Sequence, residues 1–313
     1  MRPEDSVVTA RPTPVRVLPP TQLGVAELVG YKRGRTISVC LPARNEVATV
    51  GPICAQIVTR LMNSETGCLV DELIVFDDGS TDTTATAARR NGARVVRVGD
   101  VLPATGPGRG KGNVLWKSVA ESTGDIIVWC DTDLTSFTPN YIIRMVTPLL
   151  LDDSIDLVKG FYERPLDTRG DGGGRTTELA ARPLLSRFFP SLATIRQPLG
   201  GECAARRSLL ERLPFVQGYG VETGLLIDTL RLVGTERIAQ VDLGIRAHRH
   251  RSLAELSEQA AEILAVVLRR IGLEDSNDVS VPPLITADGT VVDVFVDERP
   301  PLVDVPGYLA GRA

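Results

Sequence analysis

The sequence predicts an α/β fold in which a mostly parallel sheet is covered by helices on both faces. Short apolar segments alternate with amphipathic ones from Thr36 onward, and the connections between them are short. Clusters of polar side chains directly follow several of the apolar segments. Parallel sheets of this kind bind ligands at the carboxyl ends of their strands. We therefore expect a nucleotide-binding type of architecture with its site at those ends.

The composition excludes several other classes of protein. The chain has 313 residues, enough for one large domain or two small ones, and its 35 Lys and Arg against 39 Asp and Glu give no reason to expect a nucleic-acid partner. No apolar run is long enough for a membrane span, and the charged N-terminal sequence lacks the apolar core of a secretory signal. We therefore expect a cytoplasmic protein. The scattered cysteines form no CxxC pair, which argues against a disulfide framework or a cysteine zinc site.

The first half of the chain contains four expected strands. Residues 1–35 are rich in proline and predict an extended arm that ends in a short helix near residues 21–29. The expected strands span residues 37–41, 72–76, 93–98 and 125–130. Helical periodicity covers the stretch up to about residue 62, then residues 83–90 and 112–121.

The second half is less regular. Residues 155–162 and 237–243 are expected strands, and residues 167–174 form a loop of glycine and aspartate. Helices are expected at residues 176–188, 222–232 and 253–271. A hairpin around Asp288 and Gly289 is expected to join residues 284–286 to residues 291–296.

Two carboxylates follow the strand at residues 125–130. Asp131 and Asp133, separated by Thr132, can hold a hard divalent cation that binds the oxygens of a diphosphate. Two acids in a turn are also commonly solvated or cap a helix. The position after the fourth strand of a nucleotide-type sheet favours the metal site.

Two further polar clusters follow the first two strands. They are residues 42–46, with the sequence Pro-Ala-Arg-Asn-Glu, and residues 77–80, with the sequence Asp-Asp-Gly-Ser. The second also has the form of a turn with a helix N-cap. With the aspartates at 131 and 133, the three clusters resemble the nucleotide end of a GT-A glycosyltransferase of the family 2 type. A Walker A loop and a GxGxxG fingerprint are both absent, which counts against a kinase, an ATPase or a dehydrogenase.

Two basic segments complete the set. Residues 106–113 form a glycine-rich turn that leads into a helix, either a flexible surface loop or a diphosphate contact to which Lys111 supplies a charge. Residues 246–251 contain both histidines, His248 and His250, among arginines. They predict a solvated basic edge strand, a His-x-His zinc site without an evident third ligand, or an anion site with one metal-binding imidazole, and we favour the last.

Several blocks resemble a narrower family, the actinobacterial glucosyl-3-phosphoglycerate synthases. They are residues 115–118, 174–185, 197–202, 218–222 and 246–249. The resemblance implies a retaining enzyme that transfers glucose from UDP-glucose to the 2-hydroxyl of 3-phosphoglycerate, uses Mg²⁺, with Mn²⁺ or Co²⁺ as alternatives, and forms a homodimer. We expect the chain to divide into an extended N-terminal arm (1–35), a half that binds the nucleotide sugar (36–135), a half that binds the acceptor (136–274) and a C-terminal extension (275–313).

The same resemblance implies roles for individual residues. UDP-glucose would contact Pro42, Ala43, Arg44, Glu46, Asp78, Lys111, Asp131, Thr132, Tyr219, Glu222, Arg246 and Arg251. The metal would be held by Asp133 and His248, and 3-phosphoglycerate by Gly174, Arg175, Thr177 and His250. Asp133, Glu222 and Lys111 would be the catalytic residues.

The expected chemistry is stabilisation of the UDP leaving group by the metal, Lys111 and Arg251. Glu222 is the obvious carboxylate for a covalent intermediate, but we expect it to position the sugar while a β-phosphate oxygen takes the acceptor proton. The alternatives are a mannosyl-3-phosphoglycerate synthase that uses GDP-mannose, a transferase with a polyprenyl-phosphate acceptor, or a non-catalytic nucleotide-sugar-binding module. The complete set of acidic and basic residues argues against the last.

Overall fold

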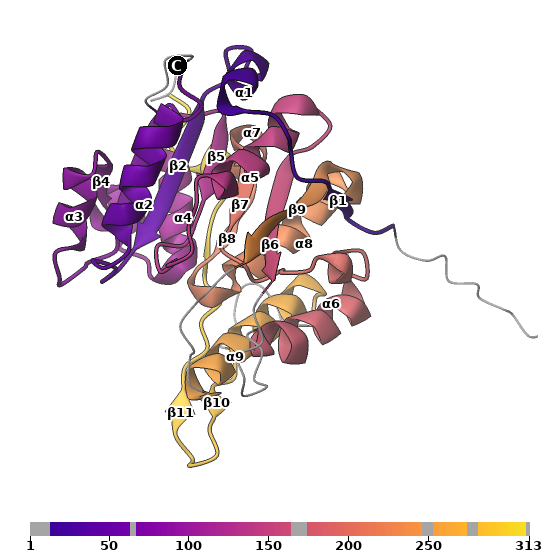
Figure 1. Ribbon diagram of the computed structural model, residues 1–313. Helices are drawn as coiled ribbons and strands as arrows, with labels where there is room; N and C mark the ends of the chain where they lie inside the picture. The colour runs from indigo at the N-terminus through magenta and orange to yellow at the C-terminus, as the bar shows by residue number, and fades with distance from the viewer. Residues whose placement is uncertain (1–12, 63–66, 164–173, 246–252, 274–280, 311–313) are drawn as a thin grey trace, which may run out of the picture.

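The computed structural model describes residues 13–62, 67–163, 174–245, 253–273 and 281–310. Its centre is an eight-stranded sheet in the order β1-β9-β6-β7-β5-β2-β3-β4, with helices on both faces (Figure 1). The strands are β1 (Arg16–Leu18), β2 (Ile37–Ala43), β3 (Glu72–Asp77), β4 (Arg94–Arg97), β5 (Ile126–Trp129), β6 (Leu157–Glu163), β7 (Cys203–Arg206) and β9 (Ile238–Ile245). The α/β class and all six strands expected for the sheet are confirmed.

The helices also agree largely with the periodicity of the sequence. They are α1 (Val25–Tyr31), α2 (Val50–Ile57), α3 (Thr84–Arg90), α4 (Gly110–Glu121), α5 (Asn140–Leu151), α6 (Arg182–Phe188), α7 (Arg207–Leu210), α8 (Val221–Val233) and α9 (Leu253–Arg270). Short π-helical turns follow α2 and precede α6, at Val58–Met62 and Thr177–Ala181. In the described part of the chain, no helix has the length and apolar character needed to cross a membrane.

Several elements were not expected, and two of them lie in the middle of the sheet or against it. One is β7, which runs antiparallel to both β5 and β6, so the sheet is mixed rather than all parallel. Its sequence, Cys-Ala-Ala-Arg, is short and lacks the β-branched residues that favour strands. The other is α5, whose apolar sequence contains Pro148 near its C-terminal end.

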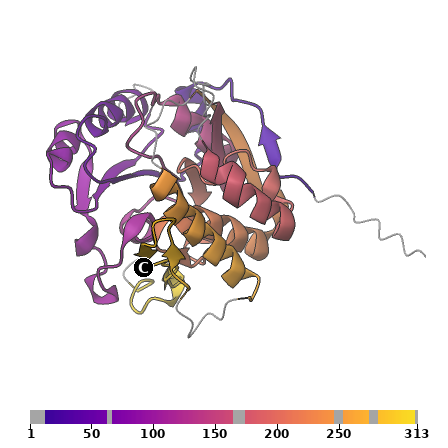
Figure 2. The ribbon, with the colours of Figure 1, turned by 90° about the horizontal axis from the view of Figure 1, so that it is seen from below.

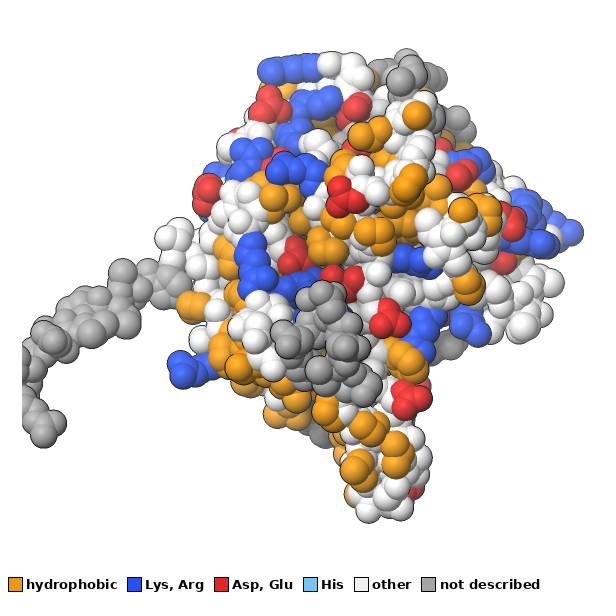
Figure 3. All heavy atoms as spheres, turned by 180° about the vertical axis from the view of Figure 1, so that it is seen from behind, with side chains coloured by type: hydrophobic (Ala, Val, Ile, Leu, Met, Phe, Trp, Pro, Cys, Tyr) orange, Lys and Arg blue, Asp and Glu red, His pale blue; other side chains and the backbone are white. Residues whose placement is uncertain are grey.

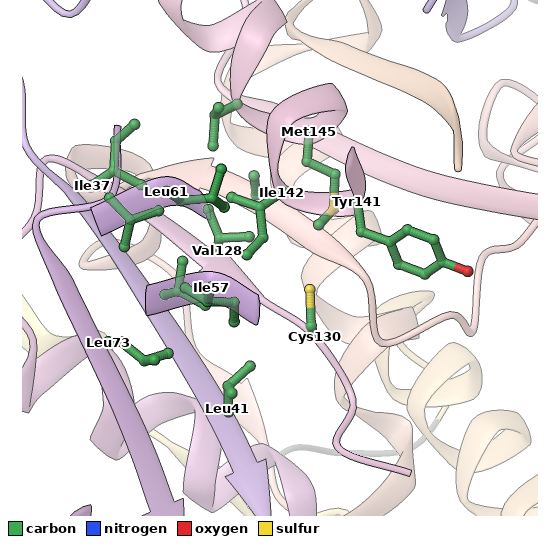
Figure 4. Close-up of a cluster of buried hydrophobic side chains, with 14 of the residues drawn as sticks. Ile37, Leu41, Ile57, Leu61, Leu73, Val128, Cys130, Tyr141, Ile142 and Met145 are labelled. Carbon is green, nitrogen blue, oxygen red and sulfur yellow. The ribbon is translucent and has the colours of Figure 1, made fainter. Parts of the chain in front are cut away.

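Strand alternation creates two hydrophobic cores. Along β2, Val39 and Leu41 enter one core and Cys40 the other, and β5 divides its side chains in the same way. Ile57 of α2 and Ile142 of α5 cover the first core (Figure 4). Helices α4 and α8 cover the second. Because the central strands are buried on both faces, polar groups gather at the strand ends.

The two terminal segments are built into the fold. The expected arm contributes β1, which pairs in parallel with β9. The expected hairpin is present as β10 (Leu284–Ile285) and β11 (Val291–Val292), and it projects from the body with apolar side chains on its surface (Figures 1 and 3). A further strand, β12 (Glu298–Arg299), was not expected and pairs antiparallel with β8 (Phe215–Val216). The expected division between residues 135 and 136 lies in the connection after β5, and both expected halves contribute strands to the same sheet.

Candidate functional site

A cavity of about 520 Å³ lies at the carboxyl ends of β2, β3 and β5. It is lined by every predicted site residue of the described part of the chain: Pro42, Ala43, Arg44, Glu46, Asp78, Lys111, Asp131, Thr132, Asp133, Gly174, Arg175, Thr177, Tyr219 and Glu222. The remaining predicted residues, Arg246, His248, His250 and Arg251, lie outside the described residues. The structure thus brings together residues that are far apart in the sequence, while their individual roles stay predictions.

Lys111 lies between two carboxylates in this cavity. Its Nζ is 2.7 Å from Oδ1 of Asp131 and 2.9 Å from Oε1 of Glu222. Lys111 is in the first turn of α4, Asp131 follows β5, and Glu222 is in the first turn of α8. The side chains are only 21%, 23% and 10% exposed, respectively. One ammonium group therefore joins three elements at the edge of the cavity.

The charge on Lys111 is secured by these partners. Burial alone would lower the pKa of the ammonium group, but the carboxylates of Asp131 and Glu222 outweigh burial and hold the pKa above its usual value. Lys111 is therefore a cation throughout the physiological pH range, and it partly neutralises two acids that lie close together.

Glycines allow the surrounding loops to approach this cluster. A Cβ atom on Gly110, whose φ is 66°, would lie 2.7 Å from the Cα atom of Gly218. The loop before α4 and the turn before α8 therefore touch through their backbones. Nearby, the backbone N–H of Arg109 donates to Oε1 of Gln217 at 2.8 Å. This contact also joins the segment that precedes Lys111 to the segment that precedes Glu222.

The ends of β2 and β5 are tied together by Thr132. Its hydroxyl donates to the carbonyl oxygen of Pro42 at 2.8 Å, and the residue is buried. With Thr132 directed toward the sheet, its neighbours Asp131 and Asp133 both line the cavity. This arrangement places two carboxylates where the sequence predicts a metal site.

Asn45 connects the polar cluster at residues 42–46 to the cluster that begins at residue 77. This residue has a positive φ of 58°, its backbone N–H donates to the hydroxyl of Ser80, and its Oδ1 accepts from the backbone of Thr81. Asn45 does not line the cavity, whereas its neighbours Arg44 and Glu46 do. Burial raises the pKa of Asp78, Arg44 opposes this, and Asp77 adds to it.

The charges of the cavity are consistent with a divalent cation. Its described lining contains five carboxylates, those of Glu46, Asp78, Asp131, Asp133 and Glu222, against three cations, Arg44, Lys111 and Arg175. A diphosphate would be repelled by this acidic lining unless a cation entered with it. Among the described residues, no group of three or more His, Cys, Asp or Glu side chains is close enough to form a metal site.

Sequence reasoning missed one wall of the cavity. Leu256, Gln259 and Ile263 of α9 line it, together with Tyr162 and Leu199. Helix α9 packs beside the turn that begins at Thr177, at the same end of the molecule (Figures 1 and 2). The spacing of the three α9 residues is helical, but periodicity does not reveal which surface a helix covers. Tyr162 was within reach of prediction, because it lies near the carboxyl end of an expected strand.

Comparison with known proteins identifies close relatives. Residues 38–213 match the glycosyl transferase family 2. The glucosyl-3-phosphoglycerate synthase of Mycolicibacterium smegmatis is 48% identical over 287 residues, which cover 89% of this chain and 92% of that protein.

Solved structures of the Mycobacterium tuberculosis glucosyl-3-phosphoglycerate synthase are similar throughout. A complex with Mn²⁺, UDP-glucose and phosphoglyceric acid has a TM-score of 0.83 and 44% identity, and the match covers 94% of this chain and 99% of that one. A complex with Mg²⁺ and UDP has a TM-score of 0.81 and 44% identity, over 92% and 98% of the two chains.

The contact of Lys111 with two carboxylates predicts a particular pH dependence. The raised pKa means that the stabilisation by Lys111 is present below the unfolded pKa of roughly 10.4 and is lost only as the pH rises through the folded value. In Lys111→Met, Asp131 and Glu222 repel each other until one takes up a proton. The variant should lose about 2 kcal/mol near pH 8 and less near pH 5.

Thermal unfolding across this pH range measures the effect. Lys117→Met is the matched control, because Lys117 is buried in the same helix and donates to the carbonyl oxygen of Val98 at 3.0 Å. The stability difference between this control and the original protein should change little between the two pH values. If the loss of stability in Lys111→Met is also the same at both pH values, it does not arise from repulsion between Asp131 and Glu222, and the expected role of the Lys111 charge is contradicted.

Proposed function

We infer the activity of this chain from its family: it belongs to glycosyl transferase family 2 and to the glucosyl-3-phosphoglycerate synthases. It transfers glucose from UDP-glucose to 3-phosphoglycerate and releases UDP. The observation that carries this inference is that the polar strand ends and residues 174–177 line one continuous cavity. A transferase needs such a cavity, because donor and acceptor must lie side by side for the reaction.

We propose that the strand ends hold the donor. Pro42, Ala43, Arg44 and Glu46 would contact the uridine, with Asp78 beside it, and Thr132 and Tyr219 would contribute further contacts. Asp131 would bind the ribose or the diphosphate, and Glu222 the glucose hydroxyls. The fixed contact of Lys111 with both of these acids supports the assignment, because it places the carboxylates before substrate arrives.

We propose that Asp133 and His248 hold Mg²⁺ or Mn²⁺. The acidic lining of the cavity and the presence of these ions with UDP in the relatives' structures support this proposal. A bound divalent cation neutralises the charge that develops on the diphosphate as it leaves. Asp133 contributes a hard oxygen ligand, and Lys111 keeps its positive charge at the same edge of the cavity. Arg246 and Arg251 would add further positive charge near the phosphates.

The acceptor is doubly anionic, with a carboxylate and a phosphate, and therefore requires cationic and N–H donors. We propose that Gly174, Arg175 and Thr177 supply these, with His250 as a further contact. Gly174 has a positive φ of 96°, which turns the chain into the π-helical turn that begins at Thr177. The ion pair between Arg182 and Glu178, at 2.8 Å, braces that turn.

We propose that transfer proceeds with retention on one face of the sugar. The 2-hydroxyl oxygen of the acceptor would attack the anomeric carbon of the glucose while the bond from that carbon to the β-phosphate oxygen breaks. The hydroxyl proton would pass to a β-phosphate oxygen of the departing UDP. Glu222 accepts a hydrogen bond from Lys111 at 2.9 Å, which weakens it as a nucleophile and fits a role in positioning the glucose. Capture of a glucosyl adduct on Glu222 would contradict this role.

We also propose a cytoplasmic homodimer. UDP-glucose and 3-phosphoglycerate are multiply charged and do not cross membranes unaided, so the enzyme must be in the compartment that makes them.

The projecting hairpin supports the homodimer. It exposes Ile285 and Val291, at 68% and 62%, and such apolar surface is typical of an interface. Sedimentation velocity measures the assembly directly.

The activity is tested by offering purified protein UDP-glucose or GDP-mannose together with 3-phosphoglycerate and Mg²⁺. We expect UDP and a glucosylated phosphoglycerate from the first donor, and no turnover after chelation of the metal. Product from GDP-mannose alone would identify a mannosyl transferase. Hydrolysis of the donor without transfer would contradict a phosphoglycerate acceptor.

The acceptor assignment predicts an asymmetric effect of Arg175→Ala. The KM for 3-phosphoglycerate should rise about 10-fold or more through loss of a charge-assisted contact, while the KM for UDP-glucose stays nearly unchanged. Arg187→Ala is the control, because Arg187 lies on the neighbouring helix α6 and does not line the cavity. Equal increases in both KM values would remove Arg175 from the acceptor site.

A further inference from the structure

The C-terminal strand β12 and its neighbours contact both the segment that carries Lys111 and the segment that leads to Glu222. We propose that residues 297–300, acting mainly through Arg299, are a positioning element that holds the glycine-rich loop and Lys111 in place for the nucleotide. This inference rests on the proposed function, since it assigns Lys111 to the UDP-binding side. Arg299 itself does not line the cavity and is not a catalytic residue.

Arg299 fastens the loop before α4 with three groups of its guanidinium. Its Nε donates to Oδ1 of Asn113 at 2.9 Å, its Nη2 to the carbonyl of Gly106 at 3.0 Å, and its Nη1 to the carbonyl of Thr105. The group also lies 5.3 Å from the ring of Trp116. In the sequence, two of these partners precede Lys111 and two follow it. Arg299 therefore connects the loop to the helix that carries the lysine.

The guanidinium of Arg299 donates hydrogen bonds to neutral oxygens. The residue is only 7% exposed, and within the described part of the chain it forms no salt bridge with a carboxylate. Burial lowers the pKa of the guanidinium, whose ordinary value is so high that it stays charged. A buried cation is costly unless its donors are satisfied, and here each nitrogen of the guanidinium donates to a neutral oxygen, two in the loop and one on Asn113 of α4. The loop and the arginine therefore stabilise each other.

The loop needs such an external partner because of its sequence. Gly106, Gly108 and Gly110 all have positive φ values, of 81°, 60° and 66°. Glycines lose more conformational freedom on ordering than other residues do, so a loop with three of them is not rigid by itself. A planar guanidinium with fixed donors can hold it in one conformation.

The same C-terminal segment is also anchored to the turn before α8. Strand β12 pairs with β8, and the backbone N–H of Gln217 donates to the carbonyl of Asp297 at 2.7 Å. Gln217 directly precedes the turn of Gly218–Gly220 that leads to Glu222. On the other side, the indole of Trp116 donates to the carbonyl of Pro300 at 2.7 Å. Residues 297–300 thus fix the helix of Lys111 relative to the turn before Glu222.

The test compares Arg299→Ala and Arg299→Lys with the same substitutions at Arg207. Arg207 is a matched control, since it is 9% exposed and donates to the carbonyls of Gly124 and Val119 and to the hydroxyl of Ser122, at the opposite end of α4. The full-length variants are titrated calorimetrically with UDP in the presence of Mg²⁺. Their thermal stability and both KM values are also measured.

We expect Arg299→Ala to raise the Kd for UDP and the KM for UDP-glucose by about 10-fold or more and to lower kcat, because small displacements of positioning groups are costly. The KM for 3-phosphoglycerate should stay unchanged, and Arg299→Lys should recover part of the UDP affinity. The Arg207 variants should lose comparable thermal stability and keep their UDP affinity.

Two results would overturn the inference. One is normal UDP affinity in Arg299→Ala despite reduced stability, and the other is an equal loss of affinity in the Arg207 variants. If Arg299→Ala does not fold, Arg299→Lys decides by the same criteria. UDP binding by the unaltered protein without any glucose transfer would instead refute the proposed function and leave the titrations as a test of the positioning role.

Discussion

The ammonium group of Lys111, placed between the carboxylates of Asp131 and Glu222, is the interaction on which the rest of the site depends. The three residues come from separate elements: Lys111 from α4, Asp131 from the segment that follows β5, and Glu222 from α8. Without the cation, two acids would have to share a poorly solvated space, and one of them would be driven to bind a proton. With it, the two carboxylates are held in place before substrate arrives. Preorganised charge of this kind requires no rearrangement during the reaction.

Contacts outside the cavity hold this cluster in place. Gly110 and Gly218 permit backbone contact between the two loops, and Arg299 fastens the first of these loops from the C-terminal strand. The ion pairs of Arg270 with Asp228 and with Glu298 in turn hold that strand to α8 and α9. Residues 297–300, near the end of the sequence, therefore support a site whose lining comes from both halves of the chain.

The part of the cavity at the strand ends could be predicted from the sequence because of a general property of parallel sheets. Polar residues that follow apolar strands must gather at one edge, so Arg44, Asp78 and Asp131 could be placed together without a structure. The supporting parts left no such pattern. Strand β7 is short and alanine-rich, β12 has only two residues, and the contacts of Arg299 join positions nearly 200 residues apart. The face that α9 turns toward the cavity depends on packing partners, which periodicity alone does not identify.

The most direct test of the central interaction uses two adjacent glycines. A Cβ atom on Gly201 would overlap Oδ1 of Asp131 and lie 2.5 Å from Nζ of Lys111, whereas on Gly200 its nearest neighbour would be the carbonyl oxygen of Gln197 at 3.4 Å. The measurement is UDP affinity, in the presence of Mg²⁺, of Gly201→Ala and Gly200→Ala, alongside their thermal stability. The account predicts that both variants fold and that only Gly201→Ala loses affinity, by about 10-fold or more. Undiminished affinity in a folded Gly201→Ala protein would contradict it.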